Sequence, residues 1–229
     1  MDNLNLINPQ PKTLLVVDDA VDNLQMLTAL LKDEYQIRVA KNGEQALRLL
    51  EENPNIDLIL MDVGAEYANY SSDMTRTIPV NGRFTKRQKE VYNAVLRVKN
   101  EATKLLVPGT LWAEYHKEVG KIMTSELLGL GLLDKADVQN ENPEWPAYKK
   151  YFMHGTSHHI GLDTHDYGIL WEKMTENMVF TVEPGIYIPE EGFGVRLEDD
   201  VVIQKKGEPF NLMGNIPIEA EEIEEIMNK

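Results

Sequence analysis

Residues 58–77, LILMDVGAEYANYSSDMTRT, decide how the rest of the chain is interpreted. The stretch opens with an apolar run, typical of a buried strand, that delivers Asp62. After Gly64 the chain returns through a second extended run to Asp73. Two strands joined by a short turn would bring these two carboxylates side by side, where they repel each other unless a cation lies between them. The stretch therefore predicts a metal site.

Composition limits the classes of protein that the chain can belong to. Its 229 residues suffice for one large domain or two small ones. Acidic residues outnumber basic ones by 38 to 23, and the net charge of −15 disfavours a nucleic-acid partner or an anionic membrane surface. The absence of cysteine excludes disulfides and thiolate chemistry. Without a signal-peptide pattern or an apolar run of membrane-spanning length, we expect a cytoplasmic protein.

The first part of the chain alternates strand and helix patterns. Short apolar runs at residues 13–17, 35–40 and 56–61 predict strands, and apolar residues at helical spacing lie between them. This order predicts a β-α-β-α-β segment with a parallel sheet. Asp18 and Asp19 end the first strand, where they could bind a cation or could simply be a solvated strand end or a helix cap.

The motifs LLVVDDAVDNLQMLTALL, VAKNGEQALRLL and DLILMDV resemble the first half of a response-regulator receiver domain. The resemblance implies a flavodoxin-like half domain over residues 1–62. It also implies Mg²⁺ at Asp18 and Asp19 and a phosphoacceptor at Asp62. It stops after Asp62, because the strands that carry the hydroxyl and the lysine of that family do not follow.

The remainder predicts two helices, at residues 84–105 and 111–128, with Thr85 as a possible cap of the first. Residues 129–146 are polar and marked by Gly and Pro, so a surface loop is expected there. Residues 218–227 predict a short acidic helix. We expect the second of these helices and the terminal helix to pack and to carry no chemistry.

Histidines and carboxylates gather after the second helix. Four of the five histidines lie between residues 154 and 165, which favours a site over isolated structural roles. His159 among them is expected to be an ordinary surface or packing histidine. Glu183 ends an apolar strand, and Arg196 and Glu198 share a face of an alternating one. Each carboxylate alone could be a solvated strand end.

A second resemblance covers the chain from Asp62 onward. DVGAEYANYSSDMTRTIPVNGRFTKRQKEVYNAVL, FMHGTSHHIGLDTHD, VFTVEPGIYI and GVRLEDDVVI resemble, in this order, the catalytic domain of Xaa-Pro aminopeptidases, of the creatinase or pita-bread fold. The implied architecture is α/β and α+β: a receiver-like half joined through its third strand to a partial pita-bread domain over residues 63–229. Asp62 is shared at the junction.

The aminopeptidase resemblance assigns roles to these residues. By this resemblance Asp62, Asp73, His158, Glu183 and Glu198 match, one for one, the five ligands of a two-metal centre. Four carboxylates and one imidazole suit Mn²⁺ first, with Co²⁺ or Zn²⁺ as alternatives. Glu183 would also move a proton. His154 and His165 would lie on the substrate side, and Arg196 would support a ligand carboxylate.

Three hypotheses remain open, because the first half of an aminopeptidase catalytic domain is missing. The chain could be a dinuclear metallo-aminopeptidase, impaired or not, that cleaves a peptide before a proline in second position. It could be a recombined or engineered chimera without activity, or a receiver-like module that accepts phosphate or binds Mg²⁺. Unmatched apolar faces at the junction would favour a homo-oligomer.

Overall fold

The computed structural model describes residues 13–17, 21, 24–25, 28–29, 32, 36–52, 56–169 and 171–229. The chain divides into two compact units, Met1–Ile59 and Leu60–Lys229. Asp18, Asp19 and most of the first predicted helix lie outside the described residues.

The first unit contains a parallel strand pair, as its apolar pattern predicts. Strand β1 (Thr13–Val17) pairs with β2 (Gln36–Ala40), and helix α2 (Gly43–Glu52) follows β2 and packs on the pair. The third predicted strand, β3 (Leu58–Val63), starts two residues later than expected. Among the described residues it pairs with β6 (Met74–Pro79) and not with β1 or β2, so the prediction of one parallel sheet of three strands is wrong for β3.

The deciding stretch forms a long hairpin within the second unit. Between β3 and β6 lies the small antiparallel ribbon of β4 (Glu66–Tyr67) and β5 (Tyr70–Ser71). A Cβ on Gly64 would lie 2.5 Å from the carbonyl oxygen of Ser72, so a side chain there would push the two arms apart. The expectation of two strands that return to each other is confirmed, although the turn is itself a ribbon.

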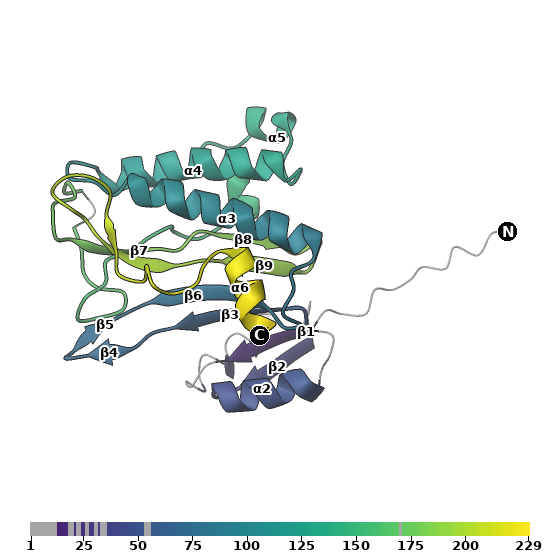
Figure 1. Cartoon of the computed structure of the whole chain (residues 1–229). Coiled ribbons are helices and arrows are strands. Elements are labelled where there is room, and N and C mark those ends of the chain that lie inside the picture. Colours follow the sequence, from purple (N-terminus) through teal and green to yellow (C-terminus); the bar gives the residue numbers. More distant parts are fainter. Residues whose placement is uncertain are drawn as a thin grey trace. The chain divides into compact units, whose positions relative to one another are not determined.

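Helices cover the strands of the second unit on one side. Figure 1 shows helix α3 (Lys86–Lys104) lying across the sheet strands, with α4 (Trp112–Gly129) packed on it. The strands beneath are β7 (Val179–Val182), β8 (Gly185–Ile188), β9 (Phe193–Arg196), β10 (Asp199–Val202) and β11 (Phe210–Asn211). They form the antiparallel order β11-β10-β7 and a separate β8-β9 pair.

The start of α3 follows from its sequence. Thr85 accepts a hydrogen bond from the Gln88 backbone N–H, and the Gln88 side chain accepts one from the Thr85 N–H, which is a complete capping box. The predicted cap is therefore present. The inner face of the helix is fully buried at residues that include Val91, Tyr92 and Val95.

Three sequence expectations need correction. The loop predicted at residues 129–146 contains helix α5 (Lys135–Gln139). The Asp134 side chain caps this helix, because it accepts hydrogen bonds from two backbone N–H groups of the first helical turn. A 3-10 turn (Ala147–Lys150) follows. Strand β9 ends at Arg196, so Glu198 lies between two strands. The terminal helix α6 is shorter than expected, at Ala220–Met227. Among the described residues, no helix has the length and apolarity needed to cross a membrane.

Candidate metal centre

Strand ends carry four of the predicted ligands. Asp62 lies on β3, and Asp73 lies directly before β6. Glu183 follows β7, and Glu198 precedes β10. Because β7 and β10 are antiparallel neighbours whose register pairs Val182 with Asp199, these last two carboxylates leave the sheet at the same edge.

The fifth ligand candidate, His158, is tied to the sheet through its main chain. Its N–H donates to the Thr181 hydroxyl at 3.2 Å, and its carbonyl accepts from the Thr181 N–H at 3.0 Å. Its ring Nδ1 lies 2.9 Å from the carbonyl oxygen of His159. A carbonyl only accepts, so Nδ1 carries the proton and the neutral ring leaves Nε2 free to bind a metal.

The predicted ligands form one cluster. His158 Nε2 lies 3.6 Å from an oxygen of Asp73 and 3.6 Å from an oxygen of Glu183. Ligand atoms of Asp73, His158 and Glu198 all lie within 4.8 Å of one another. Besides burial, the charge of Asp73 contributes to raising the pKa of Asp62, so these two carboxylates are also electrostatic neighbours. The hairpin and the sheet edge therefore bring all five side chains together.

Burial and mutual repulsion raise the pKa values of two carboxylates of this cluster, Glu183 and Glu198. Burial raises the pKa of Glu183 to about 7. Burial, together with the charges of Glu183 and Asp73, raises the pKa of Glu198 to about 8. Both effects oppose a negative charge, so the fully ionised cluster is electrostatically unfavourable without a cation.

The other members of the cluster respond to the same excess of negative charge. Although burial acts against its charged form, hydrogen bonds and the charges of Asp73 and Glu183 raise the pKa of His158 to about 9. Burial raises the pKa of Asp62, and Arg196 opposes that shift. Burial acts in the same direction on Asp73, but hydrogen bonds to His158 and Asp62 prevail and lower its pKa. A bound cation would relieve this competition for protons.

Two buried oxygen atoms support the fit of divalent ions. Among the described residues, Glu198 Oε1 and Asp200 Oδ1 are buried without a hydrogen-bond partner. A buried carboxylate oxygen without a partner costs about 1–3 kcal/mol or more, and a metal ion would remove that cost at Glu198. Carboxylate oxygens and one imidazole nitrogen form a donor set suited to Mn²⁺, Co²⁺ or Zn²⁺. The residues therefore fit the group that the sequence predicts.

Arg196 lies where a supporting residue is expected. Its guanidinium donates to Asp62 at 2.5 Å through one nitrogen and to the Thr75 hydroxyl at 3.1 Å through another. Thr75 in turn donates to Glu198 at 2.7 Å. Arg196 thus joins carboxylates from two separate segments.

The two predicted substrate-side histidines differ in exposure. His165 is exposed, and its ring centroid lies 4.4 Å from that of His158. His154 is half-buried, with Nδ1 2.7 Å from the Gly155 carbonyl oxygen and Nε2 2.8 Å from the Tyr187 hydroxyl. Both ring nitrogens of His154 are therefore engaged within the chain, whereas His165 can turn to a ligand.

An open cleft of about 410 Å³ borders the cluster at His158. His159, which the sequence leaves without a chemical role, stacks on Trp112 at a centroid distance of 6.0 Å and forms part of the cleft wall. The complete lining is Trp112, His158, His159, Asp163, His165, Asp166, Tyr167 and Gly168. The cleft gives a small organic molecule access to the cluster.

Sequence reasoning misses several contributors to the centre. Tyr187 and Thr75 bond predicted residues, yet a hydroxyl within a strand carries no local signal of that kind. Asp200 accepts a hydrogen bond from the Asp73 N–H at 3.0 Å, and burial raises its pKa to about 6. Its position two residues after Glu198 was the available signal, because alternate residues of a strand share a face.

Carboxylates and one imidazole at strand ends, beside an open cleft, define the class of protein as one with a candidate divalent-metal centre. Residues 38–205 match the model of metallopeptidase family M24. The chain belongs to this family, and its solved neighbours share the mixed α/β pita-bread fold. The aminopeptidase-like part of the predicted resemblance is confirmed, and the receiver-like half stays a prediction.

Individual relatives agree with the family match. The Xaa-Pro aminopeptidase of Escherichia coli (strain K12) is 44% identical over 183 residues, which are 75% of this chain and 41% of the relative. Zinc-substituted E. coli aminopeptidase P in complex with product superposes with a TM-score of 0.66 at 41% identity over 75% of this chain and 41% of that one. The same enzyme with the inhibitor Pro-Leu gives 0.66 at 42% identity and the same coverage. The chain thus spans about two fifths of these relatives' length.

Proposed function

We propose that the chain is a metallo-aminopeptidase of the Xaa-Pro type, which removes the N-terminal residue of a peptide whose second residue is proline. One observation carries the proposal. Side chains from separate strand ends converge until ligand atoms of Asp73, His158 and Glu198 lie within 4.8 Å of one another, and Glu198 keeps a buried oxygen unpartnered among the described residues. The relatives named Xaa-Pro aminopeptidase supply the reaction class.

The roles proposed for the ligands follow from their positions. Asp62, Asp73, His158, Glu183 and Glu198 would hold two divalent ions, with Mn²⁺ the first choice and Co²⁺ or Zn²⁺ the alternatives. When bound, two such ions supply a nucleophile at neutral pH and polarise the scissile carbonyl. The mostly carboxylate donor set is what favours Mn²⁺ over a softer ion.

Other residues of the chain would handle protons and the substrate. Glu183, whose raised pKa of about 7 suits proton exchange near neutral pH, would pass a proton to the leaving amine. His165 would donate a hydrogen bond to the peptide from the cleft wall. His154 would have to exchange its bond to Tyr187 before it could do the same. Arg196 would hold Asp62 in place.

The short chain keeps two alternatives in the proposal. It spans about two fifths of its relatives' length, so the activity of those whole enzymes is only proposed for it, and a non-catalytic chimera is the competing interpretation. The receiver-like interpretation of residues 1–62 stays a prediction, because Asp18 and Asp19 lie outside the described residues. Asp62 itself accepts a hydrogen bond from Arg196, and the charge of Asp73 acts on its pKa, which favours the metal centre as its role.

Metal titration tests the proposal directly. Chelator-treated protein is titrated with Mn²⁺ by calorimetry, and the same sample is assayed on a peptide with proline in second position. We expect two ions per chain, with hydrolysis that Asp73→Ala abolishes. Binding without hydrolysis would support an intact centre on an incomplete enzyme. Labelling by a small phosphodonor that Asp62→Asn removes and Asp73→Ala leaves intact would favour the receiver-like alternative.

A further inference from the structure

The hydroxyl of Thr75 lies at a junction inside the centre. Thr75 is fully buried on β6, two residues after Asp73. Its Oγ1 lies 2.7 Å from Glu198 Oε2 and 3.1 Å from Arg196 Nε. Nothing in the local sequence distinguishes it from other strand threonines, so only the fold reveals the arrangement.

The chemistry of the three groups fixes the direction of both hydrogen bonds. A guanidinium can only donate, so the Thr75 oxygen accepts from Arg196. A carboxylate oxygen accepts, so the single hydroxyl proton of Thr75 goes to Glu198 Oε2. The hydroxyl is therefore oriented by Arg196 and has no second proton to donate to another group.

This arrangement decides which oxygen of Glu198 stays available. Oε2 is occupied by Thr75, while Oε1 is buried and has no partner among the described residues. The main chain reinforces the pair, because the Glu198 N–H donates to the Thr75 carbonyl at 3.0 Å. Two bonds between the same two residues restrict both the backbone and the carboxylate of Glu198.

We propose that Thr75 is a positioning residue of the metal centre, whose hydroxyl holds Glu198 Oε2 so that Oε1 is presented to the ion shared with Asp73 and His158. The inference rests on the proposed metal centre and adds to it the group that orients one ligand. Removal of a group that orients a metal ligand lowers metal affinity by about 10- to 100-fold.

Thr77 offers a matched control on the same strand. It is fully buried like Thr75, and it lies two residues further on the same face of β6. Its hydroxyl also contacts Arg196, donating to the carbonyl at 3.0 Å and accepting from the N–H at 3.2 Å. These bonds go to main chain and reach no carboxylate, so Thr77→Val removes a buried hydroxyl without touching a ligand.

The experiment compares three full-length variants with the unsubstituted chain. Thr75→Val keeps the shape and removes the hydroxyl, Thr75→Ser restores it, and Thr77→Val is the control. Each is titrated with Mn²⁺ by calorimetry, and the Co²⁺-loaded form is examined by visible absorption. We expect Thr75→Val to weaken the tighter Mn²⁺ site by about 10- to 100-fold and to shift the Co²⁺ bands. Thr75→Ser and Thr77→Val should remain within about threefold of the unsubstituted chain.

The possible outcomes separate this inference from the proposed function. Equal affinities of Thr75→Val and Thr77→Val would overturn the positioning role, even if the protein hydrolyses peptides. Absence of Mn²⁺ binding by the unsubstituted chain would also overturn it. Binding that weakens in Thr75→Val would support it, even if no hydrolysis is found. Thermal unfolding of the metal-free variants shows whether a loss of affinity reflects a general loss of fold. If Thr75→Val is unfolded, Thr75→Ser is compared instead: Mn²⁺ affinity within about threefold of the unsubstituted chain supports the role of the hydroxyl, and a larger loss contradicts it.

Discussion

Glu198, immediately before β10, and Asp199 and Asp200, its first two residues, differ in the charges that surround them. Asp199 pairs with the Arg76 guanidinium at 2.6 Å and with the Lys99 ammonium, and it accepts from Asn211 at 2.8 Å. Glu198 and Asp200, its neighbours on either side, each keep a buried oxygen unpartnered among the described residues. Successive residues of an extended chain point to opposite faces. The chain's own cations neutralise the face of Asp199, the paired face, whereas Glu198 and Asp200 lie on the opposite, unpaired face and are candidates for binding an ion.

The exposed fraction alone does not distinguish Asp199 from Glu198 and Asp200. Glu198, Asp199 and Asp200 are 1%, 1% and 2% exposed. Burial raises the pKa of Glu198 to about 8 and of Asp200 to about 6, because no cation of the chain compensates them fully. A buried charged residue is thus informative about function only when its partners are known. A residue that is paired with an opposite charge of the chain stabilises the fold, whereas one without such a partner is a candidate ion-binding residue.

The largest effect should come from removing a charge on the unpaired face. In Glu198→Gln the side chain keeps its size and its acceptor for Thr75, but it loses the anionic oxygen. We expect Mn²⁺ affinity to fall by at least about 100-fold and hydrolysis to disappear, since a ligand is lost outright. Calorimetry and the peptide assay measure both.

The same substitution should not weaken the metal-free fold. Above about pH 8, the pKa of Glu198 in the metal-free fold, the substitution removes a charge that Glu183 and Asp73 repel. At such a pH the urea midpoint of the chelated variant is expected to equal or exceed that of the unsubstituted chain. A lower midpoint with retained Mn²⁺ affinity would mean that Glu198 is a structural residue like Asp199.

A change on the paired face should act on stability instead. Asp199→Asn leaves the buried Arg76 and Lys99 charges without their anion, and breaking a buried pair in this way costs about 3–5 kcal/mol. Urea unfolding of the metal-free protein measures the loss. Asp200→Asn is the matched control: it keeps an acceptor for the Asp73 N–H and removes an uncompensated charge, so it should change stability by less than about 1 kcal/mol.

The unpaired face should also make metal stabilisation depend on pH. The pKa values of Glu183, Glu198 and His158 are raised to about 7, 8 and 9 in the metal-free fold. Groups that bind protons more tightly when folded stabilise the fold at low pH, and this contribution is lost as the pH rises through the folded pKa. Asp73, whose pKa is lowered, contributes stability that is fully present above about pH 4 and is lost only as the pH falls below it, so it does not change this dependence near neutral pH.

Mn²⁺ replaces the protons that these groups lose. The increase in Tm on adding saturating Mn²⁺ should therefore grow steadily from about pH 5.5 to about pH 8.5. Differential scanning calorimetry with and without chelator measures it. An increase that is constant across this range would mean that the cluster is not where the ion binds.

The sequence predicts local features of this molecule better than contacts between residues that are far apart along the chain. The capping box at Thr85 and the strand-end position of Glu183 depend on residues a few positions apart, and both are present. The acidic run of Glu198, Asp199 and Asp200 is equally visible in the sequence. The sequence does not show which of the three is neutralised. The neutralising cations, Arg76 on β6 and Lys99 on α3, lie about 100 residues or more away along the chain.

Some elements and contacts were predicted wrongly or missed for a related reason. Helix α5 was predicted as loop because its five residues, Lys135–Gln139, are too few to show an apolar period, although the Asp134 cap was available as a signal. Tyr187 was missed because its bond to His154 joins two segments whose approach depends on the whole sheet. The candidate ligands could be named from motifs, but the groups that orient them required the fold.

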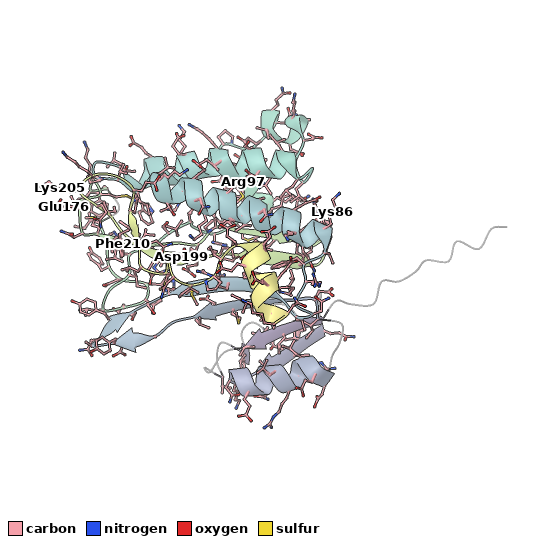
Figure 2. All side chains as sticks on the ribbon, in the orientation of Figure 1. Lys86, Arg97, Glu176, Asp199, Lys205 and Phe210 are labelled. Atoms are coloured by element: carbon pink, nitrogen blue, oxygen red, sulfur yellow. The ribbon has the colours of Figure 1, made fainter. Side chains whose placement is uncertain are left out.

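The smallest effect should come from an ion pair that matches the Asp199 pair in geometry and differs in exposure. Arg97 donates to Glu126 at 2.6 Å and 3.0 Å across α3 and α4, and its side chain is 57% exposed, against 2% for Asp199. Figure 2 shows both labelled residues, with Asp199 beneath the helix that carries Arg97. Because water and salt screen an exposed pair, Glu126→Gln should lower the free energy of unfolding by less than about 1 kcal/mol. Urea unfolding at low and at high salt measures this. A loss as large as that of Asp199→Asn would mean that the contact distance, and not burial, sets the contribution of an ion pair in this protein.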